Sequence, residues 1–186
     1  RKFVMLVIVS TIPTGVIGIL FKDTVELAGT MLVVPGICLL ITSVFLVIAD
    51  YADEGTKRPR EASYVNAGLI GVAQGIATMP GLSRSGTTIT ACLLCGFEKK
   101  FAVKYSFIMS IPAVLGAVVL ELKDVAKAPL QASAVPACAV ATVISAIVGY
   151  LSICIMMRLI QGKKYKIFAV YCAIVGLITV GYGIFR

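Results

Sequence analysis

The chain has 186 residues, of which 59% are hydrophobic and 14% are charged. Soluble domains carry about 25% charged residues, so this composition excludes a soluble globular domain and predicts an integral membrane protein. The formal net charge is +8. Because the basic residues gather at the ends of apolar runs, we expect them to set topology and to meet the bilayer surface, and we expect no nucleic-acid partner.

Five apolar runs are long enough to cross a bilayer, which takes about 20 residues per helix. Short polar joints separate them, and the most hydrophilic joint, residues 50–61, must lie in water. These runs predict an all-α polytopic membrane protein in which residues 1–186 form a single integral membrane domain. The predicted spans are residues 3–21, 31–49, 101–120, 133–157 and 167–185.

The region 64–97 differs from these spans. An apolar run, residues 67–79, is followed by the polar stretch PGLSRSGTT, residues 80–88, and by a second apolar run, residues 87–97. The second run would make a helix about 16 Å long, roughly half of a hydrocarbon core that is about 30 Å thick. We therefore predict one re-entrant helix-turn-helix over about 64–97, with the polar stretch at its tip inside the membrane. One broken span that crosses fully is the alternative.

The distribution of basic residues favours the re-entrant arrangement. It places twelve of the seventeen Lys and Arg residues on one side of the membrane and four on the other, whereas a full crossing gives eight on each side. Cytoplasmic segments carry an excess of Lys and Arg, so the twelve-to-four division is preferred and the richer side is cytoplasmic. The remaining basic residue, Arg84, lies within the hairpin.

The polar stretch 80–88 has the composition of an oxyanion-binding turn. An ionisable residue inside a membrane is costly, and the planar guanidinium of Arg84 can fork onto two oxygens of a phosphate or carboxylate. Glycines at 81 and 86 allow a tight turn, and we expect Ser85 or Thr87 to cap the helix that follows, whose free N–H groups favour an anion. Phosphate is the predicted ligand. The hydroxyl groups around Arg84 are those of Ser83, Ser85, Thr87 and Thr88.

Other interpretations of these residues stay open. Arg84 could instead pair with a buried carboxylate or with backbone carbonyls, which would only hold two hairpins together. Gln74, in the apolar helix before the turn, either faces the same cavity or joins helices by a hydrogen bond. The pair Cys92 and Cys95 has metal-binding spacing but encloses two leucines, so we interpret it as a packing pair.

Groups that hydrolyse a phosphate ester are missing from this stretch. Hydrolysis needs an activated water or nucleophile and usually a metal. The chain has no histidine, and Glu98 follows Arg84 by 14 residues, which is about 20 Å along a helix. The sequence therefore predicts a phosphate-binding site with no metal ligands and no evident general base on this chain.

Residues 71–88, GVAQGIATMPGLSRSGTT, closely resemble the second signature of the undecaprenyl pyrophosphate phosphatase (bacitracin-resistance) family. The landmarks Ile12-Pro13, Asp23-Thr24 and 107–112 are similar in order. The resemblance implies a multi-pass enzyme of the bacterial inner membrane that hydrolyses undecaprenyl pyrophosphate to undecaprenyl phosphate and inorganic phosphate, recycling the carrier lipid of cell-wall synthesis. It also implies a fold of inverted repeats, each with a re-entrant hairpin.

The resemblance carries roles onto individual residues. Arg84 and Ser83 are implied to be catalytic and to orient the pyrophosphate of the polyprenyl lipid. A divalent metal, magnesium or calcium, is implied as cofactor, with ligands that are not on this chain, and a homodimer stays open as an assembly. The residues implied to bind substrate or to shape its site are Ser85, Thr88, Gly81, Gly86 and Gln74.

One part of the family pattern has no match here. The family's first signature combines two glutamates spaced four apart with a Pro-x-Ser-Ser-x-Gly-His stretch. We therefore expect this chain to be the carboxy-terminal two thirds of a longer enzyme, to supply the arginine and serine half of a split site, and to be inactive alone. Two alternatives stay open: a transporter or flippase for phospholipid or polyprenyl phosphate, in which Arg84 binds the phosphate that crosses, and a non-catalytic membrane scaffold.

Overall fold

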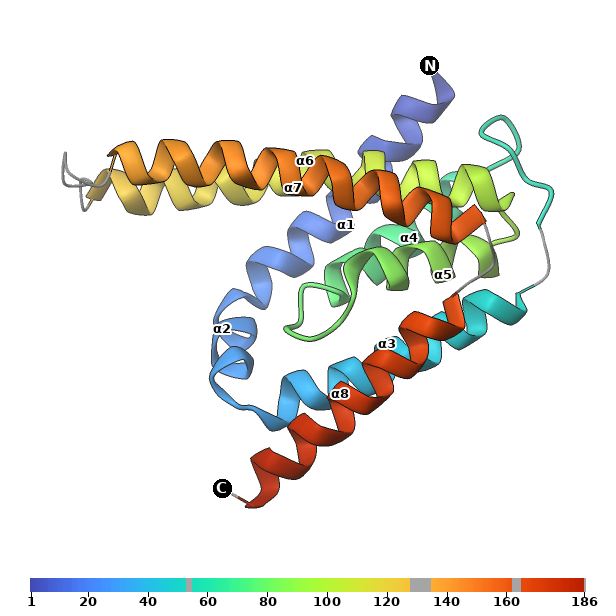
Figure 1. Ribbon diagram of the computed structural model, residues 1–186. Coiled ribbons are helices and arrows are strands. Elements are labelled where there is room, and N and C mark those ends of the chain that lie inside the picture. The colour runs from blue at the N-terminus through green and yellow to red at the C-terminus, as the bar shows by residue number, and fades with distance from the viewer. Residues whose placement is uncertain (53–54, 128–134, 162–164, 186) are drawn as a thin grey trace.

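Helices make up all the regular elements of the computed structural model, which describes residues 1–52, 55–127, 135–161 and 165–185. Five of these helices, α1, α3, α6, α7 and α8, are long and apolar enough to cross a membrane, which confirms the predicted all-α polytopic architecture. The first two residues of the predicted span 133–157 lie outside the described ranges. In the described residues the helices are α1 (Lys2–Leu20), α2 (Lys22–Thr30), α3 (Val33–Tyr51), α4 (Tyr64–Ile76), α5 (Arg84–Leu94), α6 (Lys99–Lys127), α7 (Val135–Gln161) and α8 (Tyr165–Phe185) (Figure 1).

Helix α2 lies where the sequence indicated only a polar joint. Its nine residues contain charged and apolar side chains in close alternation, so no apolar run marks it. Asp23 lies in its first turn, where a carboxylate is favoured by the positive end of the helix dipole. Lys22 and Glu26 add an ion pair one helical turn apart, at 3.8 Å. The chain therefore passes from α1 to α3 through a short helix.

Helices α1 and α4 pack closely because glycine removes the side chain at their contact. A Cβ atom on Gly71 would lie 2.1 Å from the backbone oxygen of Ser10, and one on Gly75 would lie 2.7 Å from Ile17. The hydroxyl of Thr14 donates a hydrogen bond to the Gly71 carbonyl oxygen at 2.8 Å. Small residues of this kind let helix backbones approach in a membrane, where apolar burial alone does not drive association.

Helices α3 and α8 form a second close pair, seen side by side in Figure 1. Cβ atoms on Gly36 and Gly176 would each lie within 3.2 Å of the other residue's carbonyl oxygen. The Ser43 hydroxyl donates to the Ala169 carbonyl oxygen at 2.8 Å. Helix α8 thus packs along α3, which also contacts α5 of the hairpin.

The predicted helix-turn-helix is present as α4, a turn over residues 77–83, and α5. The two helices pack against each other, and α5 also contacts α3 and α6. Helices α4 and α5 each begin and end three residues earlier than the apolar runs 67–79 and 87–97, and α5 begins at Arg84 itself. The polar stretch therefore lies partly in the turn and partly in the first turn of α5.

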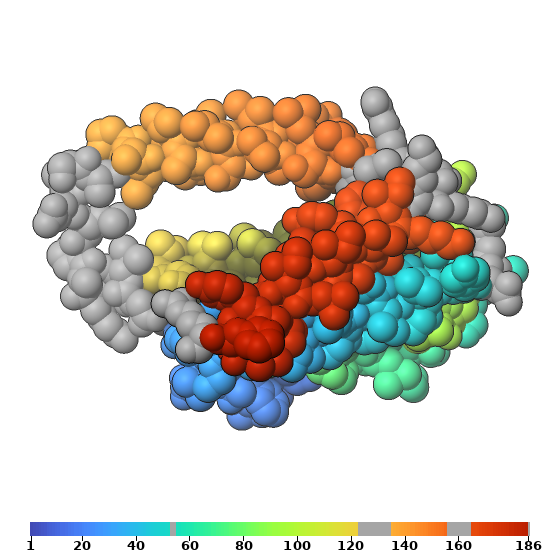
Figure 2. Space-filling model, turned by 60° about the horizontal axis from the view of Figure 1, so that its bottom comes forward, coloured from blue at the N-terminus to red at the C-terminus, as the bar shows by residue number. Residues whose placement is uncertain are grey.

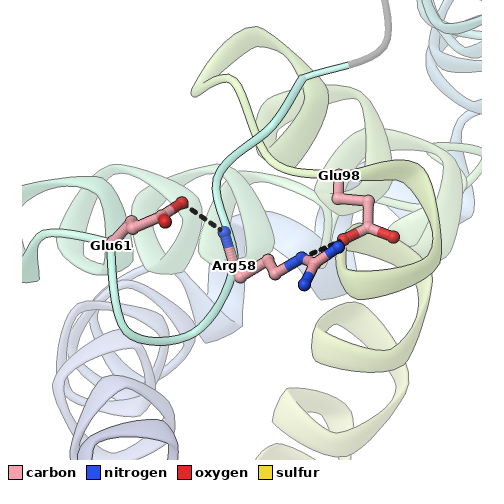
Figure 3. A network of polar contacts seen from close by, with 3 residues as sticks. All are labelled: Arg58, Glu61 and Glu98. Atoms are coloured by element: carbon pink, nitrogen blue, oxygen red, sulfur yellow. Dashed lines mark hydrogen bonds and ion pairs between the residues drawn. The ribbon is translucent and has the colours of Figure 1, made fainter.

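The open end of this hairpin is joined to the loop 55–61. Lys57 forms a β-bridge with Phe97, and its ammonium group donates to the Cys95 carbonyl oxygen at 2.8 Å. Arg58 pairs with Glu98 at 3.1 Å, and its amide donates to the Glu61 carboxylate (Figure 3). The loop before α4 and the junction after α5 therefore lie at the same end of the hairpin, opposite the turn.

Helix α7 has little contact with the rest of the described structure. Nearly all of its described side chains are exposed, and Figure 2 shows an open space between α7 and the helices α6 and α8. Its residues are apolar, with a mean hydropathy of 2.3 over the candidate span. An exposed apolar surface of this length is the property expected of a helix that faces lipid or other membrane helices.

Candidate functional site

The turn that carries PGLSRSGTT ends in a capped helix. Ser83 is the N-cap residue of α5, and its hydroxyl oxygen accepts a hydrogen bond from the Gly86 amide at 3.2 Å. The expectation that Ser85 or Thr87 caps this helix is therefore wrong. The helix starts earlier because Ser83 has an extended backbone conformation and lies three residues before Gly86, which is the spacing that an N-cap serine requires.

Two backbone amides at the start of α5 are free to meet a ligand. The Thr87 amide donates to the Ser83 carbonyl oxygen at 2.9 Å, which begins the helical ladder. Within the described residues, the amides of Arg84 and Ser85 have no hydrogen-bond acceptor. Free N–H groups at a helix amino terminus point along the axis and favour negative charge. This end of α5 therefore has the geometry of an anion site.

Arg84 occupies the first helical position, beside those amides. Its side chain is partly buried, and no described carboxylate lies within ion-pair distance of its guanidinium. A cation is unfavourable at the positive end of a helix dipole, so this position calls for an anion in front of it. The alternative in which a buried carboxylate neutralises Arg84 finds no such partner among the described residues.

The conformation of the turn depends on Gly81. Its φ angle is +88°, in the left-handed region that residues with a side chain rarely adopt. A Cβ atom there would lie 2.2 Å from the Pro35 carbonyl oxygen on α3. Gly86 is also confined, because a Cβ atom on it would lie 3.1 Å from the Ser83 hydroxyl oxygen. Gly81 thus permits the turn, and Gly86, inside α5, leaves room for the Ser83 cap. Their part in shaping the substrate site stays a prediction.

The remaining hydroxyls of the stretch differ in their surroundings. Ser85 is partly exposed next to Arg84, whereas Thr87 is buried and its hydroxyl has no hydrogen-bond partner in the described structure. Thr88 is buried, donates to the Arg84 carbonyl oxygen at 2.8 Å, and lies 2.5 Å from the Ser106 hydroxyl on α6. The structure therefore brings Ser83, Arg84 and Ser85 together at the turn and places Thr88 between helices.

Gln74 lies in the interior of the bundle. It is 1% exposed, and its amide nitrogen is 3.4 Å from the Thr14 hydroxyl and 3.5 Å from the Met109 carbonyl oxygen. Its amide oxygen is buried without a partner. The amide group thus connects α4 with α1 and α6, which is the arrangement expected of the helix-joining interpretation. A part in lining the substrate site stays a prediction.

Thr42, which the sequence did not single out, lies in α3 and contacts the turn directly. Its hydroxyl accepts a hydrogen bond from the Ser83 amide at 2.9 Å and lies 3.3 Å from the Gly81 carbonyl oxygen, to which it donates. Three residues along α3, the Phe45 carbonyl oxygen accepts from the Thr90 hydroxyl of α5 at 3.0 Å. The signal in the sequence was a hydroxyl pair, Thr42-Ser43, inside an apolar run.

The chemistry of this site is that of hydroxyls, amides and one guanidinium. Magnesium and calcium prefer carboxylate and carbonyl oxygens, and no group of three His, Cys, Asp or Glu residues in the described part of the chain could hold a metal ion. The residues around Arg84 do not by themselves fit a divalent metal. They can bind and orient an oxyanion, and they supply no carboxylate or imidazole that could act as a general base.

A family model described as bacitracin resistance protein BacA matches residues 1–178. A protein named undecaprenyl-diphosphatase from Methanosphaera stadtmanae is 42% identical over 182 residues, which cover 97% of this chain and 64% of that relative. One of the same name from Halothermothrix orenii is 39% identical over 180 residues, covering 97% of this chain and 70% of the relative. Undecaprenyl-diphosphatase 2 from Bacillus thuringiensis is 38% identical over 179 residues, which cover 95% of this chain and 65% of that relative. The chain spans about two thirds of the length of these relatives.

Proposed function

The chain belongs to the bacitracin resistance protein BacA family, and from that premise we propose that it takes part in hydrolysing undecaprenyl pyrophosphate to undecaprenyl phosphate and inorganic phosphate. This reaction recycles the carrier lipid of cell-wall synthesis. The five apolar helices and the family make the chain a multi-pass membrane protein, located in the bacterial inner membrane.

One observation carries the proposal: a half-buried arginine without a described acidic partner lies beside the free amides at the amino terminus of α5. The Arg84 guanidinium can donate two parallel hydrogen bonds to the terminal phosphate. The Ser83 hydroxyl oxygen accepts from Gly86, so its own proton is free to be donated to a phosphate oxygen. Donors of this kind stabilise the charge that grows on the phosphoryl oxygens and on the leaving phosphate in the transition state.

The reaction needs a second set of groups. A water oxygen attacks the terminal phosphorus, the bond from that phosphorus to the bridging oxygen breaks, and the electron pair leaves with undecaprenyl phosphate. A base must take the proton of the attacking water. We place that base, and the ligands of the magnesium or calcium ion that the family resemblance implies, on a segment equivalent to the additional third of the relatives' length. The chain thus supplies the arginine and serine half of a split site.

The fold supports a re-entrant position for the hairpin. Helices α4 and α5 have 13 and 11 residues, or about 20 Å and 16 Å, which is less than the thickness of a hydrocarbon core. The bridge between Lys57 and Phe97 puts the basic loop 55–61 and the basic start of α6 at one end of the hairpin. The turn with Arg84 then lies at the other end, within the membrane. A second hairpin related by an inverted repeat would face it, and a homodimer remains a prediction.

Phosphate release from undecaprenyl pyrophosphate in detergent, with magnesium or calcium present, tests the proposal. The proteins to compare are this chain and this chain joined to the amino-terminal segment of a BacA relative, each with and without Arg84→Lys. Lysine keeps the charge but loses the two-pronged geometry. Arg60→Lys is the matched control, because Arg60 is exposed in the loop 55–61, far along the chain from the turn.

We expect phosphate release only from the joined protein and a loss of at least about tenfold on Arg84→Lys, corresponding to one charge-assisted hydrogen bond. Release by this chain unaided would overturn the split site. Movement of labelled lipid across vesicles without hydrolysis would favour the transporter alternative, and unchanged lipid binding by Arg84→Lys would favour a scaffold.

A further inference from the structure

Thr42 lies outside the hairpin, on α3, and its hydroxyl forms hydrogen bonds to the turn on both sides of Leu82. Thr42 is 1% exposed. It accepts from the Ser83 amide at 2.9 Å and donates to the Gly81 carbonyl oxygen at 3.3 Å. Both bonds are part-buried, and a backbone group that loses its partner where water has little access carries a desolvation cost. These two bonds therefore restrain the turn, together with the bond from the Leu82 amide to the Met79 carbonyl oxygen.

The atoms that Thr42 holds are adjacent to the groups that face the ligand. The Ser83 amide belongs to the residue whose hydroxyl caps α5, and Arg84 is the next residue in the chain. Gly81, on the other side of Leu82, has a φ angle of +88°. Since the backbone from 81 to 84 sets the direction of both the Ser83 hydroxyl and the first free amides of α5, a change in the Thr42 contact moves all of them together.

The position of Thr42 is itself determined by the surrounding helices. Its neighbour Ser43 donates to Ala169 on α8, and the next turn of α3 meets α5 through Thr90 and Gly86, with Leu46 lying 3.5 Å from where a Gly86 Cβ atom would be. The closely packed pair α3 and α8 thus supports the anion-binding turn from outside the hairpin. A hydroxyl held on a rigid helix gives more accurate placement than a contact within the turn itself.

We propose that Thr42 is a positioning residue of the phosphate site, which acts through the backbone of Gly81 and Ser83 without touching the substrate. The expected effect of Thr42 on catalysis rests on the proposed function, whereas its effect on the conformation of the turn does not. Placement errors of about 1 Å at a catalytic group reduce turnover by up to about a hundredfold, so loss of the Thr42 hydroxyl should lower kcat more than it raises KM.

The experiment compares Thr42→Val, Thr42→Ser and Thr142→Val with the unchanged protein. Valine has nearly the shape of threonine without its hydroxyl, and serine restores the hydroxyl. Thr142 is the control because it is exposed on α7 and its hydroxyl bonds only to Cys138 of its own helix. The first measurement is hydrogen–deuterium exchange of the hydrogen-bonded amides of Ser83 and Gly86 in this chain, with the amides of α1 and α4 as the internal reference for global unfolding.

We expect Thr42→Val to speed exchange of the Ser83 and Gly86 amides by about tenfold or more while α1 and α4 are unchanged, and Thr42→Ser to restore the original rate. Exchange of these two amides that is the same in Thr42→Val as in the unchanged protein would overturn the proposal. The second measurement is kcat and KM for phosphate release in the protein joined to a BacA amino-terminal segment. We expect kcat to fall about tenfold with KM within about twofold, with recovery in Thr42→Ser.

Failure of this inference and failure of the proposed function give different results. If the joined protein releases no phosphate, the function fails, and amide exchange alone then decides whether Thr42 holds the turn: faster exchange of the Ser83 and Gly86 amides in Thr42→Val supports that role, and unchanged exchange contradicts it. If the joined protein is active, faster exchange in Thr42→Val without any fall in kcat shows that Thr42 does not position the site.

Discussion

The hydroxyl oxygens of Thr88 and Ser106 lie 2.5 Å apart, between α5 and α6, and Thr88 also donates to the Arg84 carbonyl oxygen. Both residues are buried. A hydroxyl pair of this kind joins two helices where water cannot compete for the hydrogen bond. Thr88 therefore helps to hold α5 against α6. This role is additional to its predicted part in substrate binding.

Thr88→Val and Ser106→Ala should each destabilise the protein, because each change leaves the other hydroxyl buried without a side-chain partner. We expect a cost of about 1–3 kcal/mol for each single change, and less than the sum of the two for the double change. Thermal unfolding in detergent measures the costs. A variant Thr88→Val that unfolds like the unchanged protein but hydrolyses lipid poorly would show that Thr88 serves the substrate and not the helix contact.

Gly71 and Gly68 lie on the same helix, one turn apart, and should respond in opposite ways to alanine. A Cβ atom at Gly71 meets the Ser10 backbone oxygen at 2.1 Å, whereas one at Gly68 meets no atom within 4 Å. Gly71→Ala should therefore separate α1 from α4 and cost about 1–3 kcal/mol, while Gly68→Ala should stabilise α4 by up to about 1 kcal/mol. Unfolding midpoints of the two variants give the test, and equal midpoints would contradict the close contact at Gly71.

The backbone contact of the loop 55–61, rather than its ion pair, should hold that loop in place. Arg58 and Glu98 are 73% and 29% exposed at their side chains, and exposed ion pairs contribute about 0–1 kcal/mol. Gly55, by contrast, lies so close that a Cβ atom would be 2.2 Å from the Gly96 carbonyl oxygen. We expect Glu98→Gln to leave protease sensitivity of the loop nearly unchanged and Gly55→Ala to raise it. The reverse order would show that the charge pair is the main contact.

The spans and the hairpin could be predicted because they depend on properties that are local in the sequence. Apolar runs of sufficient length mark helices such as α3 and α8, and a polar stretch between two short runs marks the turn. Helix α2 was not predicted because its nine residues lack an apolar run. The cap was placed too late because serine occurs at both 83 and 85, and only the backbone conformation distinguishes them.

The parts of the site that could not be predicted are contacts between distant segments. Thr42 is 41 residues from Ser83 along the chain, and nothing in the run 31–49 says which side of α3 meets the turn. Likewise, the sequence could not tell that Gln74 bonds toward Thr14 and Met109. Such pairings depend on how α3, α6 and the hairpin pack together, which the pattern of one segment does not contain.

We propose that Arg84 and the free amides of α5 bind the pyrophosphate group of a lipid. The affinity of this chain for geranylgeranyl pyrophosphate, measured by calorimetry in nanodiscs of neutral lipid, tests it most directly, since neutral lipid removes competing headgroup charge. We expect Arg84→Lys to weaken binding by about tenfold or more and Arg60→Lys to leave it unchanged. Geranylgeraniol, which has no phosphate, should bind with no dependence on Arg84. Equal affinities of the unchanged chain and Arg84→Lys for the pyrophosphate lipid would contradict it.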